Sequence, residues 1–504
     1  MIDAPNNGVF DKAQRLFKQR EFQALSQLLK DSGRWLYEDL IPRLERGLVS
    51  PIKNFGRLTT FIDVLSRADE AAATCLRLAF AKSLASQLGD TEFAAEHRLL
   101  KLAALIDSIE EDAAAGALRD ALAKRILSRS GPPISRPRTK IVYMAASPIP
   151  TQAANCVHVM KMCGAISRSG RELLLTARKS RDAELRADLF GEFCVDVFDC
   201  EFFDNVGNQK SIAIDQFLSG YRSGGTHFLG RSLVGCYAAA LAGMPTCLEQ
   251  HAPVKGTNRV IARDLFRQPS FRGLIVISDA LGKHYLEHYP QLVGNIFVVP
   301  DAADPPVPSP AKFDFAMSNP GALQVGYAGH LYAGKGAEII IQLAKRMPDV
   351  AFHVLGGVDS DVSEWSRRSD DSGNLHFYGH QPHAVVSSFL QGLDISLVPC
   401  LTRVMAHGGV EVADWMSPLK LFEYMAHGLP IVSSDLPVLR EVLEDGSNAL
   451  LCDPDDIDSW ISAIARLQHD KSLCRKLSRR AKDDFEQNYT WEIRAAKALA
   501  PLLS

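Results

Sequence analysis

The stretch "VGYAGHLYAGKGAEIIIQLAKRM" (325–347) combines a short apolar segment, a glycine-rich turn and an amphipathic pattern. Residues 325–328 fit a buried strand, Gly329 to Gly336 supply the turn, and the apolar residues that follow recur at helical spacing. A strand, a tight turn and a helix in this order are typical of a parallel α/β sheet. Glycine-rich turns and helix amino ends attract anions, and Lys335 adds a full positive charge. The stretch therefore predicts either an anion site or a plain turn with a solvated lysine.

The string "GHLYAGKG" (329–336) nearly satisfies the P-loop pattern of nucleotide-binding proteins. However, Gly336 stands where that pattern requires the Ser or Thr hydroxyl that binds magnesium. A kinase or ATPase P-loop is therefore not expected here.

A second stretch, "SPLKLFEYMAHGLPIVSSD" (417–435), reads as a helix that runs into a buried strand. We expect Ser417 to be the N-cap, Pro418 to occupy the first helical position and Gly428 to end the helix. Helical spacing puts Lys420, Glu423, Tyr424 and His427 on one face. The segment would thus start at the carboxyl end of a strand, as 329–336 does.

Lys420 and Glu423 have two interpretations. They could form an exposed ion pair, which would contribute only tenths of a kcal/mol. Alternatively, Lys420 could join Lys335 at one diphosphate, while Glu423 accepts hydrogen bonds from a ribose, as an acidic residue does in dinucleotide folds. We favour the ligand interpretation because two independent segments agree.

The remaining sequence alternates strands and helices twice after residue 139. This pattern predicts two doubly wound, Rossmann-like α/β domains that face each other across a cleft, preceded by an all-α N-terminal domain. We expect a helical domain at 1–130 and a Pro-rich linker at 131–139. The first α/β domain would span 140–303 and the second 304–485. A last helix, 486–504, would pack back on the first α/β domain. In this architecture, ligands bind at the carboxyl ends of the strands and between the domains.

The composition is that of an ordinary globular protein of 504 residues, with 46% hydrophobic and 23% charged residues. A net charge of −3 gives no general attraction to nucleic acid. The ten cysteines are scattered without a CxxC pair, which favours buried thiols in a reducing compartment. No apolar run reaches membrane-spanning length and the first residues lack a signal-peptide core, so we expect a cytoplasmic protein, with peripheral contact at the inner membrane face as a further option.

Several motifs together resemble glycosyltransferase family 4, the retaining enzymes of GT-B fold, over about residues 139–504. The resemblance rests on "GHLYAGKG", on "SPLKLFEYMAHGLPIVSSDLPVLREVLEDGSNALLCDPDD" and "YTWEIRAAKAL", and on "KIVYMAASPIPTQAANCVHVMKMCGAISRSG" and "FLGRSLVGCYAAALAGMPTCLEQHAP" nearer the N-terminus. It implies transfer of a sugar from a nucleotide-sugar, UDP- or GDP-linked, to a glycan, a lipid-linked sugar or a small acceptor. It also implies retention of configuration, no metal and no cofactor other than this substrate.

The resemblance further implies roles for particular residues. The catalytic candidates are His251, Lys335 and Glu423, of which Glu423 matches the ribose-binding second glutamate of the family's Glu, seven residues, Glu motif. The donor-binding candidates are Gly329, His330, Lys335, Ser417, Pro418, Leu419, Lys420, Glu423, Tyr378 and His380. The acceptor-side candidates are Asn155, His158, Arg231 and Glu249. For each loop residue the alternative is a polar side chain satisfied locally, and for Tyr378 and His380 the base contact would involve backbone atoms.

Two positions depart from the family pattern. Trp415 stands where the first glutamate of the motif would fall, and His330 stands where an arginine usually neutralises phosphate. His330 can replace it only if it is protonated, or as a neutral donor. Lys420 is a candidate to compensate. These departures leave a second hypothesis open, in which a transferase-like domain that has lost activity serves as a binding module.

We expect no metal site. Asp359 and Asp361 imitate the metal-binding DxD motif of the other glycosyltransferase fold, but Asp361 with Glu364 also fits the start of a helix. A third hypothesis is another GT-B enzyme, such as a nucleotide-sugar epimerase. The basic, amphipathic "DKAQRLFKQR" (11–20) suggests that residues 1–130 bind a protein partner or a membrane surface.

Overall fold

A computed structural model describes residues 139–504, apart from 152, 181–188, 205–208, 257, 308–311, 317–320, 370, 371 and 407–409. It also describes scattered residues between 12 and 28 and residues 123 and 127. The expected helical domain and linker therefore lie almost wholly outside the described residues. The chain divides into two compact units, Met1–Pro137 with Asn205–Thr246 and Val254–Arg272, and Arg138–Asp204 with Cys247–Pro253 and Gly273–Ser504.

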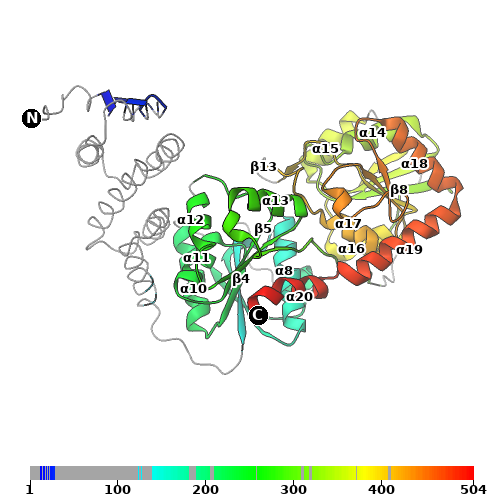
Figure 1. Cartoon of the computed structure of the whole chain (residues 1–504). Helices are drawn as coiled ribbons and strands as arrows, with labels where there is room; N and C mark the ends of the chain where they lie inside the picture. The colour runs from blue at the N-terminus through cyan, green and yellow to red at the C-terminus, as the bar shows by residue number, and fades with distance from the viewer. Residues whose placement is uncertain are drawn as a thin grey trace, which may run out of the picture. The chain divides into compact units, whose positions relative to one another are not determined.

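The first α/β region, in which Figure 1 labels strands β4 and β5, is built on a seven-stranded sheet of order β3-β2-β1-β4-β5-β6-β7. β1 pairs in parallel with β2, β2 with β3, and β6 with β7. Its strands are β1 (Lys140–Ile149), β2 (Glu172–Lys179), β3 (Asp199–Phe203), β4 (His227–Gly230), β5 (Thr246–Gln250), β6 (Phe271–Val276) and β7 (Ile296–Val298).

Helices connect these strands, as the sequence predicts. They are α8 (Ala154–Arg168), α9 (Leu189–Glu192), α10 (Gln209–Arg222), α11 (Leu233–Leu241), α12 (Asn258–Leu265), α13 (Asp279–His288) and the short 3-10 helix η2 (Pro290–Leu292). The sequence "FCVDVFD" (193–199) predicts a short buried strand, and this prediction is wrong, because β3 begins only at Asp199 and runs to Phe203.

The second α/β region has a six-stranded sheet of order β10-β9-β8-β11-β14-β15, in which every neighbouring pair is parallel. Renumbered within the sheet, this order is 3-2-1-4-5-6, which is the doubly wound Rossmann order. The strands are β8 (Leu323–Ala328), β9 (Val350–Leu355), β10 (Leu375–Phe377), β11 (Ile395–Val398), β14 (Ile431–Ser434) and β15 (Leu450–Cys452). A separate antiparallel pair, β12 (Met405–Ala406) and β13 (Val410–Glu411), was not predicted from the sequence.

Two buried clusters pack against this sheet. Ile340 of α14 and Trp460 of α18 belong to one, while Phe422 of α17 and Phe485 of α19 belong to the other. The helices are α14 (Ala337–Arg346), α15 (Asp359–Arg368), α16 (His383–Gln391), α17 (Leu419–Ala426), α18 (Ile457–His469), α19 (Lys471–Asn488), α20 (Trp491–Leu503) and the 3-10 helix η3 (Leu439–Glu441). The prediction of two doubly wound domains is therefore confirmed.

The glycine-rich turn between β8 and α14 is needed for steric reasons. Gly334 and Gly336 have φ values of 80° and 91°, which L side chains rarely adopt. A Cβ at either position would lie 1.8 Å from a backbone carbonyl oxygen, that of Arg403 or of Pro399. The predicted strand, turn and helix of 325–347 are thus confirmed, and the glycines allow close backbone approach.

The start of α17 differs from the prediction. The N-cap position is Pro418, without a side-chain cap, and helical residues begin at Leu419. Ser417 is one residue too early to cap the helix, and its hydroxyl instead accepts a hydrogen bond from the backbone N–H of Asp301 at 2.9 Å. The helix ends next to Gly428, whose φ of 61° fits the predicted stop.

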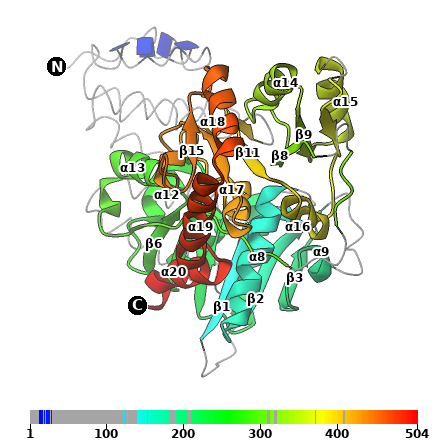
Figure 2. The same ribbon diagram turned by 90° about the vertical axis from the view of Figure 1, so that its right-hand side faces the viewer.

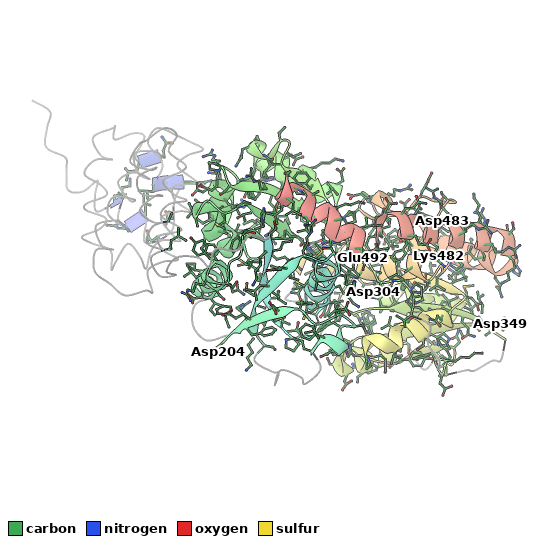
Figure 3. The ribbon with its side chains drawn as sticks, turned by 90° about the horizontal axis from the view of Figure 1, so that it is seen from below. Asp204, Asp304, Asp349, Lys482, Asp483 and Glu492 are labelled. Atoms are coloured by element: carbon green, nitrogen blue, oxygen red, sulfur yellow. The ribbon has the colours of Figure 1, made fainter. Side chains whose placement is uncertain are left out.

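The C-terminal helix α20 packs on α8 (Figure 2). Glu492, near its start, accepts a 2.7 Å hydrogen bond from Arg168 of α8, and Asp304 pairs with the buried Lys161 of the same helix. Figure 3 labels Glu492 and Asp304. Of the helices that the structure describes, none combines the length and apolar character needed to span a bilayer.

Candidate functional site

The two predicted anion-binding segments meet at the end of β8. The hydroxyl of Tyr424 in α17 accepts a 2.7 Å hydrogen bond from the backbone N–H of Ala328, the last residue of β8. Lys420, one turn earlier in α17, lies over the ring of Tyr327 with Nζ 3.7 Å from its centroid. Gly329 lies beside this amine, since a Cβ there would lie 3.4 Å from Nζ, an ordinary contact distance.

Lys420 is a buried residue, only 7% exposed, and its Nζ makes no hydrogen bond to any described residue. The interpretation of an exposed ion pair with Glu423 is therefore wrong. Burial, together with the charge of Lys335, lowers the pKa of Lys420 to about 7, although Cys400 and Glu423 act in the opposite direction. Burial without an acceptor disfavours the charged form of this amine, and an anion bound beside it would favour that form. This geometry suits a phosphate.

His330 is half-buried and its ring stacks on Tyr332, with centroids 4.9 Å apart. Burial, followed by the charges of Lys335, Lys420 and His380, lowers the pKa of His330 to about 4. The imidazole is therefore neutral near pH 7. It can donate a hydrogen bond to an anion, but it adds no positive charge to replace the arginine of the family pattern.

Lys335 and Glu423 are half-buried and lie in the same electrostatic environment, because each acts on the pKa of Lys420. Lys335 directly precedes Gly336, the N-cap residue of α14, so its ammonium and the amino end of that helix add positive potential together. The structure thus places Gly329, His330, Lys335, Lys420 and Glu423 at one site.

The other donor-side candidates differ in their surroundings. The hydroxyl of Tyr378 contacts the N–H of Ala316 at 3.0 Å and Nδ1 of His353 at 2.8 Å. His380 is exposed and is close enough to influence the pKa of His330. Ser417, Pro418 and Leu419 are half-buried at the start of α17, and the Ser417 hydroxyl is occupied by Asp301.

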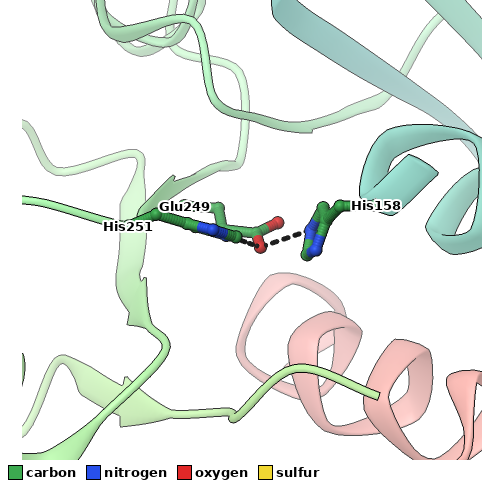
Figure 4. A group of neighbouring side chains, drawn as sticks. All are labelled: His158, Glu249 and His251. Atoms are coloured by element: carbon green, nitrogen blue, oxygen red, sulfur yellow. Dashed lines mark hydrogen bonds and ion pairs between the residues drawn. The ribbon is translucent and has the colours of Figure 1, made fainter. Parts of the chain in front are cut away.

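A second cluster surrounds Glu249, at the end of β5 (Figure 4). Nε2 of His251 lies 2.8 Å from Oε1 of Glu249, and Nε2 of His158 from α8 lies 2.8 Å from the same oxygen. The rings of the two histidines meet edge to face, with centroids 4.6 Å apart. Asp301 contacts the other nitrogen of His158 at 2.8 Å.

Arg494 of α20 completes this cluster with a 2.7 Å hydrogen bond from Nη2 to Oε1 of Glu249. Burial alone would raise the pKa of Glu249, but the charges of Arg494 and His158 and the hydrogen bond from His251 hold it well below its usual range. The pKa of Asp301 is lowered to about 2 against its own burial, mainly by His158. Both carboxylates are therefore ionised, and His251 must donate through Nε2–H, because an ionised carboxylate only accepts.

His158, Glu249 and His251 are of the residue types that bind transition metals, and their ligand atoms lie within 4.8 Å of one another. Arg494 nevertheless donates to the same Glu249 oxygen that faces both histidines. A divalent cation at this oxygen would meet the guanidinium at close range, and the repulsion would be strong in a buried site. The donor set therefore fits a hydrogen-bonded ion-pair cluster better than a metal centre.

Asn155 and Arg231 are the two remaining acceptor-side candidates. Asn155, near the start of α8, donates through Nδ2 to the Ser147 hydroxyl at 2.5 Å. Arg231 directly follows β4, in the other compact unit, and is half-buried. The structure thus joins His158, Glu249 and His251, and it does not add Asn155 to their hydrogen bonds.

Sequence reasoning missed Arg494, Asp301 and Tyr327 as parts of these sites. Arg494 lies 245 positions after Glu249, on a helix whose pattern is simply amphipathic. Its one signal in the sequence is an arginine on the apolar side of that helix, because Ala495 and Ala498 are buried beside it.

Comparison with known proteins finds a matching family model, related sequences and similar solved structures. Residues 311–484 match the model of the family described as "Glycosyl transferases group 1". The chain is 28% identical over 169 residues to a phosphatidyl-myo-inositol mannosyltransferase of Mycolicibacterium smegmatis, a match that spans 33% of this chain and 40% of the relative. It is 22% identical over 315 residues to a D-inositol 3-phosphate glycosyltransferase of Paenarthrobacter aurescens, spanning 57% of this chain and 74% of the relative.

Among solved structures, HepE of Anabaena in complex with UDP and glucose superimposes with a TM-score of 0.55 at 17% identity. The superposition covers 73% of this chain and all of that structure. The described fold is thus similar to that of known GT-B-type glycosyltransferase structures, and residues 311–484 match a glycosyltransferase domain. The second sheet, with Lys335, Lys420 and Glu423, lies within the matched segment.

Proposed function

We propose that the protein transfers a sugar, with retention and without a metal, from a UDP- or GDP-linked donor to a glycan, a lipid-linked sugar or a small acceptor. The observation that carries this proposal is the buried ammonium of Lys420, which makes no hydrogen bond to any described residue and lies beside the glycine turn at Gly329. A nucleoside diphosphate supplies the anion that this position lacks. The UDP-bound state of the structurally similar HepE supports this choice of ligand.

In the proposed mechanism, Lys335, Lys420 and the amino end of α14 neutralise the diphosphate as it leaves. Glu423 accepts hydrogen bonds from the ribose hydroxyls. His251, held by Glu249, lies beside the donor sugar and orients it. No described carboxylate is assigned as a nucleophile, so catalysis rests on positioning and on stabilising the charge of the departing phosphate.

The proposal is tested by incubating the full-length protein with a panel of UDP-, GDP- and ADP-linked sugars, with and without candidate acceptors. We expect one donor to release its nucleoside diphosphate, faster with the right acceptor than by hydrolysis. Turnover of none of these donors would contradict the proposal.

A catalytically impaired binding module is the second candidate function. It is favoured by Trp415 at the position of the motif's first glutamate and by the neutral state of His330. Residues 1–130 would then mediate contact with a protein partner or a membrane surface. Stoichiometric nucleotide binding without any release of sugar is the result that this second candidate predicts.

A further inference from the structure

The carboxylate of Glu249 is fully enclosed by side chains from separate segments of the chain. Its side chain is 0% exposed, and Oε1 faces Arg494, His158 and His251, while Oε2 accepts a 3.1 Å hydrogen bond from the hydroxyl of Tyr143. No part of this carboxylate is left to touch an acceptor in this conformation. Its effect on a reaction therefore passes through its neighbours.

His251 is the member of the cluster that is least enclosed, with a side chain that is 17% exposed, against 2% for His158. The hydrogen bond to Glu249 fixes which nitrogen of the His251 ring carries the proton and how the ring is turned. The orientation of His251 therefore depends on the position of the Glu249 carboxylate.

Arg494 is the fixed cation that holds this carboxylate. Its Nε donates to the carbonyl of Pro300 at 3.0 Å, and Nη2 donates to Glu249 and approaches the carbonyl of Val299 at 3.5 Å. The guanidinium is 1% exposed and lies 5.9 Å from the ring of Trp491 on the same helix. Its planar fork thus has one orientation, and lysine offers no equivalent.

We infer that Arg494, from the last helix of the chain, is a positioning residue for His251 and acts through Glu249. This inference rests on the proposed function, in which His251 lies beside the donor sugar. It assigns to α20 a role in the chemistry in addition to its packing on α8. It also assigns Glu249 to the support of His251 rather than to direct contact with an acceptor.

The first test compares the kinetics of Arg494→Lys with those of the wild type. Lysine keeps the charge but cannot reach Glu249 and the Pro300 carbonyl in the same geometry. We expect kcat to fall about 10- to 100-fold while the KM for the nucleotide-sugar stays within about twofold, because the diphosphate-binding residues are unchanged.

The second test measures the tautomer of the His251 ring by NMR spectroscopy. In protein labelled with ¹⁵N-histidine, the two ring nitrogens of His251 are assigned by comparison with His251→Gln. We expect the wild type to show a single Nε2–H tautomer. Arg494→Lys should show a shifted Nε2 signal or a mixture of tautomers, a change that loss of general stability would not produce in a protein that remains folded.

Matched variants distinguish an effect on the orientation of His251 from an effect on the packing of α20. Glu492→Gln removes the ion pair between α20 and Arg168 of α8 without touching the cluster, and Lys497→Met changes an exposed site on the same helix. Both should keep the wild-type kcat within about twofold and the wild-type spectrum of His251. If Arg494→Lys does not fold, Glu249→Gln with Arg494→Met removes both charges and takes its place, with the same loss of kcat expected.

The outcomes are distinct from those that test the proposed function. A wild-type protein that turns over no nucleotide-sugar contradicts the proposed function, while the spectra of His251 still decide whether Arg494 positions the ring. Unchanged kcat and unchanged ring-nitrogen shifts in Arg494→Lys, or an equal loss of kcat in Glu492→Gln, would overturn the inference.

Discussion

The backbone N–H of Asp301 donates a 2.9 Å hydrogen bond to the hydroxyl of Ser417. The carboxylate of the same aspartate contacts His158 at 2.8 Å. Ser417 lies two residues before α17, the helix that carries Lys420 and Glu423. Asp301 therefore links the segment that carries the proposed diphosphate site to the cluster that holds His251.

Lys335→Ala and Glu423→Ala should each weaken binding of the nucleoside diphosphate about tenfold or more, since each removes one charged hydrogen-bonding group from the ligand. Neither residue forms part of a buried core cluster, so the midpoint of thermal unfolding should change little. Calorimetric titration of both variants measures the effect. Unchanged affinity in both would remove these residues from the site.

Lys420→Met should weaken nucleotide binding and at the same time stabilise the protein without ligand. The folded pKa of Lys420 is about 7, below its ordinary value of 10.5, because burial disfavours the charged form. The resulting destabilisation is fully present below pH 7 and declines as the pH rises toward 10.5. Thermal unfolding at pH 6 and pH 9 measures this, and a variant that is less stable than wild type at pH 6 would contradict the account.

The affinity for UDP should fall as the pH rises from 7 to 9. Above pH 7 the amine of Lys420 is mostly neutral in the free protein, so binding a diphosphate must first take up a proton. Calorimetry in two buffers of different ionisation enthalpy, at pH 8, should show uptake of about one proton, the number that titration of a single amine allows. Lys420→Arg is the matched control, because arginine stays charged and should abolish this uptake. Equal proton uptake in the arginine variant would assign the effect to another group.

Chelation should leave activity unchanged. The cation at the His158, Glu249 and His251 cluster is Arg494, so no divalent ion is needed there. Turnover after dialysis against EDTA should stay within about twofold of the untreated rate, because removing a required catalytic metal would cost several kcal/mol. A large loss that added Mn²⁺ or Zn²⁺ restores would show that the cluster, or another site, holds a metal.

Much of the fold was predictable because its signals are local. The strand, turn and helix of 325–347 are encoded in neighbouring residues, and the glycine positions have no steric alternative. The wrong predictions concern short segments whose structure depends on distant partners. Ser417 lies one residue too early to cap α17, and its hydroxyl accepts a hydrogen bond from the distant Asp301. Residues 193–198 of the predicted strand lie outside β3, which begins at Asp199.

The candidate site was predictable only in part. Lys335 and Glu423 were predicted from helix starts and glycine spacing, which are properties of one segment. The burial of Lys420 under Tyr327, and the contact of Arg494 with Glu249, arise only when segments far apart in the chain pack together. A pattern within one sequence carries no information about such pairs.

The central claim is that Lys335, Lys420 and Glu423 bind a nucleoside diphosphate, and calorimetric titration of the full-length protein with UDP, GDP and ADP tests it most directly. The account predicts saturable, one-to-one binding of at least one of the three, weakened in Lys420→Met. Absence of binding by all three at concentrations on the order of 1 mM, where even a weak site would be occupied, would contradict it.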